Sequence, residues 1–363
     1  MNHPRLSIVI LGPAMTSSWS DENAATYRGL TRELVARGHD VLYLARDRSI
    51  RPDRDGAAGP RSGRVEHYSG LAELRDRFTI VVRAADLVIV GSSLPEGIEV
   101  GEWVTKLAAG ATAFYDFKTP TRLAQLRRGT GEDLSGRLIP RYHLYLSLTG
   151  GPALEELETD FGSPMARPLY GSVDPELYYP EPTEIKWDLG YRGGGDEGLV
   201  RLEAMLSQPA FRRQRMRVAG LRDFQSNAWP SSVQWETRME PAEYRGFYNA
   251  QRFMLNFTRP DLSAAKCSPS ARLFEAAACS TPVISDWWPG MENFFKPGEE
   301  ILIAHTPGEV LTYLRELPEP ERRMIGERAW VRVLTRHTAM HRAFELETYA
   351  LSLLHQESCV TVH

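Results

Sequence analysis

The most informative group of residues in the chain is a predicted helix start at Ser268, Pro269 and Ser270. Serine is a preferred N-cap because its hydroxyl accepts hydrogen bonds from the first amides of a helix, and proline suits the first helical position. The pattern predicts a helix over residues 269–279 with Ser268 as its cap. Capping by itself would account for these three residues.

The charged residues around this predicted helix start indicate what it could bind. Arg259, Lys266 and Arg272 are three cations close to the expected N-terminus. A helix N-terminus already carries partial positive charge, so cations beside it favour an anion such as a diphosphate. Glu275 would lie about one turn deeper on the same helix, where a carboxylate can accept hydrogen bonds from a ribose diol. Asn256, which ends the strand expected before this loop, is a further candidate for binding.

Two loops in the first part of the chain carry hydroxyl or charged side chains after an expected strand. The loop after the first strand holds Thr16, Ser17 and Ser18, whose hydroxyls can bind polar groups of a ligand. A later loop holds Asp116, which can orient a hydroxyl, and Lys118, which can contact a phosphate. A simpler role for Asp116 is that of a turn former at the end of its strand.

A third loop is rich in glycine. Thr149, Gly150 and Gly151 follow another expected strand and precede a predicted helix. Glycine lets backbone amides approach a ligand closely at such a helix start. We therefore count these three residues among the binding candidates.

A regular alternation of predicted strands and helices must position these loops. The strands are continuous apolar runs, typical of parallel strands buried on both faces, and the helices between them provide the crossovers. The predicted strands cover residues 6–11, 41–44, 87–90, 112–115, 144–148, 189–192, 216–219, 233–236, 253–256, 282–285 and 300–303. The predicted helices cover residues 24–37, 97–109, 121–127, 152–160, 198–206, 241–249, 269–279, 307–316, 319–334 and 338–354.

This pattern predicts an α/β protein with two Rossmann-like, doubly wound domains. The first covers residues 1–170 and the second residues 185–335, with a Pro- and Tyr-rich linker over 171–184. A C-terminal helix over residues 336–363 is expected to pack back toward the first domain.

The composition is close to the average of a soluble globular protein. The 363 residues are 42% apolar and 25% charged, which excludes a disordered chain or a fibrous repeat. A net charge of −4 gives no general attraction to nucleic acid or anionic lipid, so any polyanion binding must rest on a local patch. The apolar stretch 6–14 is too short for a membrane span or a signal peptide. Three cysteines without metal-ligand spacing favour the reduced cytoplasm.

The run 268–286 resembles the donor-binding motif of GT-B glycosyltransferases. More narrowly, it resembles the bacterial CgeB-like (spore maturation protein B-like) branch of the group 1, family 4-type enzymes. Shorter matches extend the resemblance over almost the whole chain, at residues 26–30, 37–41, 149–152, 171–175, 247–252, 255–256, 258–259, 288–290 and 294–295.

The resemblance implies a GT-B fold, in which two Rossmann-like domains face a cleft, and the transfer of a sugar from a nucleotide-diphosphate sugar to an acceptor hydroxyl. A UDP-sugar is the foremost donor, and no further cofactor is implied. Glu275 corresponds to the ribose-binding glutamate that ends the group's motif of two glutamates, and Cys267 stands in place of the other. No metal is expected, because the helix terminus and the cations neutralise the diphosphate. In the retaining mechanism that is expected, the leaving phosphate oxygen accepts the acceptor's proton, so the protein contributes positioning and electrostatics.

With this resemblance we assign three groups of site residues. The catalytic candidates are Asp116, Arg259 and Arg272. The donor-binding candidates are Glu275, Ser268, Ser270, Lys266, Asn256, Thr149, Gly150 and Gly151. The acceptor-binding candidates are Thr16, Ser17, Ser18 and Lys118.

The chain departs from the family's pattern in three places. Lys118 replaces a carboxylate, glycines at 193–195 stand where an arginine is common, and Lys266-Cys267 replaces Gly-Tyr. We hypothesise that Lys266 or Lys118 supplies the cationic contact to the diphosphate. The alternatives are a nucleotide-sugar 2-epimerase, which shares the fold and has no acceptor, and a nucleotide-binding relative that has lost activity.

The acceptor is the least defined partner. A glycan, a small molecule, a protein or a nucleic acid would each be compatible with the sequence. Residues 46–64 carry six arginines against three aspartates, which leaves room for an anionic acceptor, although such charge runs are usually solvated loops.

Overall fold

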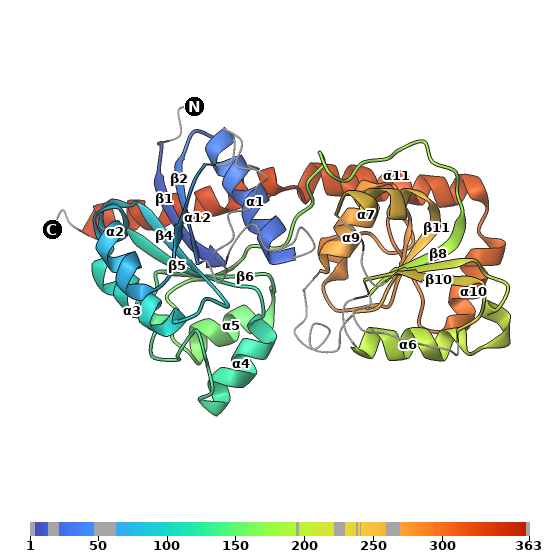
Figure 1. Cartoon of the computed structure of the whole chain (residues 1–363), viewed down its shortest axis with the longest axis horizontal. Coiled ribbons are helices and arrows are strands. Elements are labelled where there is room, and N and C mark those ends of the chain that lie inside the picture. Colours follow the sequence, from blue (N-terminus) through green and yellow to red (C-terminus); the bar gives the residue numbers. More distant parts are fainter. Residues whose placement is uncertain are drawn as a thin grey trace. The chain divides into compact units, whose positions relative to one another are not determined.

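The chain forms two compact units, residues 1–170 together with 339–363, and residues 171–338 (Figure 1). The computed structural model describes residues 4–13, 22–46, 63–193, 196–220, 229–236, 239, 241–258 and 269–360. Among the helices of this described part, none combines the length and the apolar character that crossing a membrane requires.

The first unit contains a seven-stranded parallel sheet in the order β3-β2-β1-β4-β5-β6-β7. The order reverses between β1 and β4, as in a doubly wound nucleotide-binding sheet. Its strands are β1 (Ser7–Pro13), β2 (Asp40–Arg46), β3 (Arg64–Tyr68), β4 (Leu87–Gly91), β5 (Ala111–Asp116), β6 (Leu144–Ser147) and β7 (Ala166–Pro168). Its helices are α1 (Glu22–Ala36), α2 (Leu71–Ala84), α3 (Gly97–Leu107), α4 (Thr119–Arg128), η1 (Ile139–Arg141), α5 (Pro152–Thr159) and α12 (Ala339–Val360).

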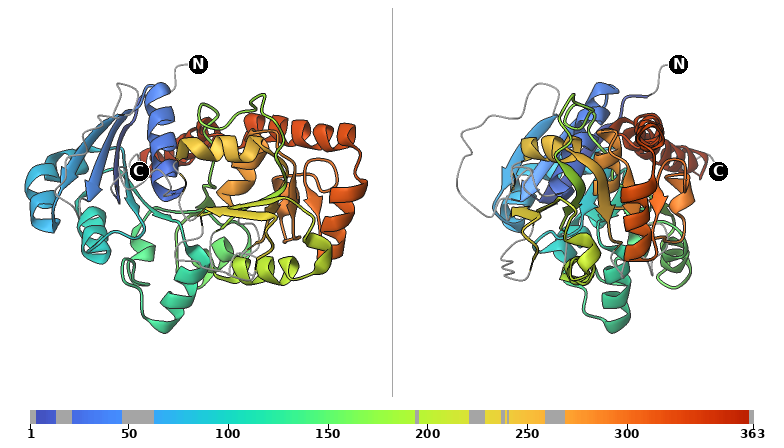
Figure 2. Two further views of the ribbon diagram at one scale, coloured as in Figure 1. Left: turned by 45° about the vertical axis from the view of Figure 1, so that its right-hand side comes forward. Right: turned by 90° about the vertical axis from the view of Figure 1, so that its right-hand side faces the viewer.

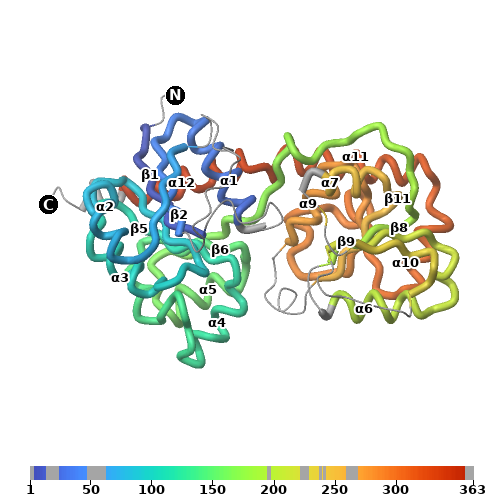
Figure 3. Tube along the Cα trace, viewed as in Figure 1, coloured from blue at the N-terminus to red at the C-terminus, as the bar shows by residue number. Residues whose placement is uncertain are grey.

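Helices cover both faces of this sheet, because successive side chains of a strand point to opposite faces (Figure 2). Val9 and Leu11 of β1 belong to the core beneath α2 and α3, whereas Ile8 and Ile10 belong to the core beneath α1 and α12. Figure 3 shows α12, at the red end of the chain, beside the blue α1. The C-terminal helix therefore completes the core of the first unit.

The second unit repeats the same topology with six parallel strands in the order β10-β9-β8-β11-β12-β13. The strands are β8 (Trp187–Arg192), β9 (Met216–Ala219), β10 (Val233–Glu236), β11 (Gln251–Asn256), β12 (Val283–Ser285) and β13 (Leu302–Ile303). The helices are α6 (Asp196–Leu206), η2 (Pro209–Phe211), α7 (Pro241–Asn249), α9 (Ala271–Ala278), η3 (Met291–Asn293), α10 (Pro307–Glu316) and α11 (Glu319–Arg336).

Helix α9 contacts β11 and β12 of the second sheet, and α11 packs directly against it. A Cβ at Gly326 of α11 would lie 2.2 Å from the carbonyl oxygen of Ser280, just after α9. Only glycine allows this approach, which fixes where α9 lies against the sheet.

The structure confirms the α/β class and the two parallel, Rossmann-like sheets that the alternation predicted. Two details differ from the expectations. Helix α9 begins at Ala271 with Ser270 as its cap, so the prediction of a helix from Pro269 was wrong. Strand β3 and helix α2, within residues 64–84, and the short strand β7 were not predicted. Both strands lie at the edges of the sheet and have no continuous apolar run, and in β3 only Tyr68 is buried.

Candidate functional site

The second sheet reverses its strand order between β8 and β11, and ligands of such sheets bind beyond the carboxyl ends of the strands at that point. Arg192 is the last residue of β8 and Asn256 is the last residue of β11. Helix α9, which lies between β11 and β12 in the chain, carries Glu275. These three polar residues are all buried.

Glu275 is held by two side chains from different elements. Its Oε2 accepts a hydrogen bond from the Tyr248 hydroxyl at 2.7 Å and another from Nη1 of Arg192. Arg192 also contacts the Tyr248 hydroxyl at 3.2 Å, and its guanidinium lies 4.1 Å from the centre of the Tyr244 ring. Both hydrogen bonds to Glu275 use Oε2, and no described group donates a hydrogen bond to Oε1.

In this group the Tyr248 hydroxyl is always a hydrogen-bond donor. Burial raises the pKa of Tyr248 well above its ordinary value, and the neighbouring Glu275 carboxylate raises it further. The phenol therefore keeps its proton at any physiological pH. Its hydrogen bond orients the carboxylate without adding charge.

The N-terminus of α9 lies next to the end of β8. The Ser270 hydroxyl accepts a hydrogen bond from the Arg272 amide at 3.4 Å, as a capping residue does. The Arg272 side chain reaches back, and its Nη1 donates to the carbonyl oxygen of Arg192 at 3.2 Å. The two arginines therefore lie at one place, beside the positive end of the helix.

Asn256 makes a side-chain hydrogen bond at the carboxyl ends of the strands of the second sheet. Its side-chain amide donates to the Ser285 hydroxyl at 3.0 Å and so links the ends of β11 and β12. Thr258 is tied to Asp286 by its amide at 2.9 Å and by its hydroxyl at 2.7 Å. These bonds fix the start of the loop that runs from β11 toward α9.

Six predicted site residues lie outside the described residues. They are Thr16, Ser17, Ser18, Arg259, Lys266 and Ser268.

In the first unit, Asp116 ends β5 and its side chain is fully enclosed. Its Oδ2 accepts a hydrogen bond from the Tyr145 hydroxyl at 2.6 Å, and its Oδ1 accepts one from the Lys118 amide at 3.0 Å. The Arg122 guanidinium lies 3.5 Å from Oδ1 and also pairs with Asp133. The carboxylate of Asp116 thus fixes the turn that carries Lys118, whose own side chain is exposed.

The glycine-rich loop after β6 is ordered by hydroxyl groups. The Ser147 hydroxyl is bonded to the Thr119 hydroxyl at 2.7 Å and accepts from the Thr149 amide at 2.9 Å. Gly151 adopts a φ of +68° just before α5, a conformation that favours glycine. Thr149 and Gly150 are buried, and Gly151 is exposed.

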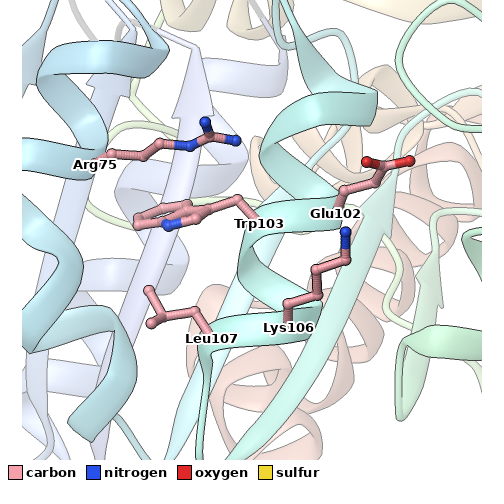
Figure 4. Close-up of a pocket in the computed structure, with 5 residues that line it drawn as sticks. All are labelled: Arg75, Glu102, Trp103, Lys106 and Leu107. Atoms are coloured by element: carbon pink, nitrogen blue, oxygen red, sulfur yellow. The ribbon is translucent and has the colours of Figure 1, made fainter.

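A separate surface hollow lies in the helix layer of the first unit (Figure 4). Arg75 of α2 and Trp103, Glu102 and Lys106 of α3 line it. These α3 residues belong to the half of the helix that runs toward the start of β5, away from the carboxyl ends of the strands. The part of the chain that the structure describes contains no group of three or more His, Cys, Asp or Glu side chains that could hold a metal ion.

The structure adds two residues that the sequence analysis did not single out, Arg192 and Tyr248. Arg192 follows the apolar run of a predicted strand directly, and a charged residue at that position is the pattern that would have identified it. Tyr248 lies on α7, and only its contact with Glu275 in the folded unit reveals it.

Comparison with known proteins agrees with this architecture. Residues 201–348 match the family model described as "Glycosyl transferase-like", so this segment is glycosyltransferase-like in sequence. No curated protein sequence matches the chain.

Solved structures with a similar fold cover nearly the whole chain. A sucrose-phosphate synthase from Thermosynechococcus elongatus has a TM-score of 0.71 at 15% identity, over 97% of this chain and 100% of that one. An α-glucosyltransferase, solved with UDP and a 13-mer DNA containing an HMU base, has a TM-score of 0.70 at 12% identity, over 96% and 100%. HepE from Anabaena, solved with UDP and glucose, has a TM-score of 0.65 at 13% identity, over 96% and 100%. These likenesses confirm the predicted GT-B fold.

Proposed function

We propose that the protein is a glycosyltransferase that moves a sugar from a nucleotide-diphosphate sugar, foremost a UDP-sugar, to an acceptor hydroxyl. The observation that carries the proposal is the buried group of Glu275, Arg192 and Tyr248 at the reversal point of the second sheet. The glycosyltransferase-like match over residues 201–348 and the UDP complexes of similarly folded proteins support it.

The ribose of the donor is bound by Glu275 in this proposal. Tyr248 and Arg192 hold one carboxylate oxygen, which leaves Oε1 as the acceptor for a ribose hydroxyl. A hydroxyl that donates to a carboxylate makes a charge-assisted bond, stronger than one between neutral groups.

The diphosphate of the donor is bound by Arg192, Arg272 and the first amides of α9. Arg192 is one residue before the glycines at 193–195, so it supplies an arginine close to the position where the resemblance expects one. The Arg272 guanidinium lies at the main-chain oxygen of Arg192, beside the helix N-terminus, and the Arg192 guanidinium lies at Glu275, one turn further along the helix. Their charges stabilise the diphosphate without requiring a metal ion. Arg259, Lys266 and Ser268 remain predicted contributors from the adjoining loop.

Catalysis in this proposal is retaining and electrostatic. Negative charge grows on the leaving phosphate as the glycosidic bond breaks, and the arginines stabilise that charge most strongly in the transition state. The phosphate oxygen then accepts the proton of the attacking hydroxyl on the same face of the sugar. The protein positions the two reactants.

The first unit supplies the acceptor side, through the loops after β1 and β5. Asp116 acts by fixing the Lys118 turn, so that Lys118 and the predicted hydroxyls of Thr16, Ser17 and Ser18 can meet the acceptor or the transferred sugar. The glycine-rich loop after β6 offers its amides to the donor.

The test is to incubate the pure protein with UDP-, GDP- and dTDP-sugars and a panel of acceptors. We expect sugar transfer, with slow donor hydrolysis when no acceptor is present. An isomerised sugar would instead identify an epimerase, and tight binding without turnover would identify a nucleotide-binding relative. Glu275→Ala should lose the activity, whereas Glu316→Ala, exposed at the far end of α10 in the same unit, should keep it.

A further inference from the structure

Arg46 and Tyr68 lie side by side at the carboxyl edge of the first sheet. They end β2 and β3 and are register partners in the ladder between these strands. The Arg46 guanidinium lies 5.7 Å from the centre of the Tyr68 ring. This edge belongs to the unit to which we assign the acceptor.

Both side chains carry buried polar atoms without a partner. Nε and Nη1 of Arg46 and the Tyr68 hydroxyl are inaccessible to solvent, and no described group makes a hydrogen bond with any of them. Nη2 of Arg46 is bonded to Glu96 at 3.1 Å, and Glu96 is itself partly exposed. Three unpaired buried polar atoms in one place are unusual, because each costs about 1–3 kcal/mol unless a ligand or an ion satisfies it.

The start of α2 adds further donors. Gly70 is the N-cap of this 14-residue helix and contributes no capping side chain. The first amides of a helix have no partner within it and favour an anion. A Cβ at Gly70 would lie 3.8 Å from Nη1 of Arg46, so the guanidinium is close to the helix N-terminus.

We infer that Arg46, Tyr68 and the N-terminus of α2 form a binding subsite for an oxyanion, namely a phosphate, sulfate or carboxylate group of the acceptor. Nη1 and the Tyr68 hydroxyl donate to the anion together with the first amides of α2, and Gly70 places no side chain between them. Nε–H points from the other edge of the guanidinium and reports on anion binding through the charge that it shares with Nη1. The competing carboxylates are Glu96, bonded to Nη2 of Arg46, and Glu73, whose Oε2 accepts from the Ser69 amide at 2.8 Å at the start of α2. The inference rests on the proposed function only in assigning the anion to the acceptor.

The direct test follows the Arg46 Nε–H resonance by NMR while inorganic phosphate, and separately sulfate, is added at constant ionic strength. The resonance is assigned by its loss in Arg46→Lys. We expect a saturable shift in the wild type, and binding on the order of tenfold weaker in Arg46→Lys, followed there through the α2 amides. Tyr68→Phe should weaken binding about threefold, and Glu96→Gln should strengthen it.

Two further variants keep the test decisive. Gly70→Asp places a carboxylate against Arg46 and also caps α2, so it should fold at least as well as the wild type and abolish phosphate binding. Arg77→Gln is the matched control, because Arg77 also lies over an aromatic ring in this unit but is already bonded to Glu66, Glu73 and the His67 carbonyl oxygen. It should leave phosphate binding unchanged.

The inference is overturned if the Arg46 resonance does not move at millimolar phosphate or sulfate, or if Gly70→Asp binds phosphate like the wild type. Donor binding measured on the same samples separates this failure from failure of the proposed function. Phosphate binding without nucleotide-sugar binding would retain the subsite and reject the glycosyltransferase. Acceptors that differ only in a terminal phosphate, carboxylate or hydroxyl then identify the group bound, since only the anionic ones should lose affinity in Gly70→Asp.

Discussion

Arg192 and Glu275 form a buried ion pair although 83 residues separate them along the chain. Arg192 is 6% exposed and Glu275 is 8% exposed. Burying either charge alone would be costly, and each is compensated only when β8 and α9 are both in place. The proposed donor site therefore exists only in the folded second unit, and this dependence determines which substitutions are informative.

Glu275→Ala should weaken nucleotide-sugar binding by about 1.5–3 kcal/mol, the value of a charge-assisted hydrogen bond. Calorimetric titration of a UDP-sugar measures this change, with circular dichroism to show that the variant is folded. Glu316→Ala serves as the control of equal charge change. Unchanged affinity in a folded Glu275→Ala protein would remove Glu275 from the donor site.

Arg272→Ala should lower kcat more than it lowers donor affinity, because phosphate charge grows as the glycosidic bond breaks. Steady-state kinetics combined with direct titration of the donor separates the two effects. Arg212, exposed after η2, provides a matched arginine whose substitution by alanine should change neither quantity. Equal losses in kcat and affinity would assign Arg272 to ground-state binding only. The same pair of measurements applies to Arg259→Ala.

Asp116→Asn should reduce the free energy of unfolding by about 1–3 kcal/mol, because the enclosed carboxylate loses charge opposite Arg122. Donor affinity should not change. Asp86 is the matched control, since its Oδ2 accepts from the Ser7 amide at 2.7 Å at the other edge of the same sheet. If Asp116 positions the Lys118 turn, turnover of the folded enzyme falls in Asp116→Asn but not in Asp86→Asn. Equal turnover in both variants would reduce Asp116 to a turn former.

Glu319→Gln should make the melting temperature depend less on pH in the acidic range. Hydrogen bonds from Arg322, and then from Arg323, lower the pKa of Glu319 to about 2 in the folded protein. A carboxylate with a lowered folded pKa contributes stability above its ordinary pKa, and this stability is lost as the pH falls toward 2. The melting temperature of the wild type should therefore fall more steeply between about pH 5 and pH 2 than that of Glu319→Gln. Glu321→Gln on the same helix controls for the loss of one charge, and parallel profiles for wild type and Glu319→Gln would contradict the prediction.

The local pattern of apolar and polar residues was sufficient to predict most of the strands and helices. Apolar runs marked β1, β4, β5 and β11 because buried parallel strands need apolar side chains on both faces. Edge strand β3 does not meet this criterion, since Arg64 and Glu66 lie within it and only Tyr68 of its residues is buried. With β3 unrecognised, the edge that brings Arg46 next to Tyr68 was not predicted.

For the site, the sequence by itself determined that a helix carries Glu275, because helix-forming patterns are local, but it placed the start of that helix at Pro269 instead of Ala271. It did not determine what Glu275 contacts, since Arg192 and Tyr248 reach it from strands and helices distant in the chain. It also offered Asp116 as a residue open to a ligand, whereas the folded unit encloses that carboxylate with Tyr145 and Arg122. Burial and the pairing of charges are properties of the packed unit, because they depend on which elements surround a side chain. Only the tertiary structure decided them.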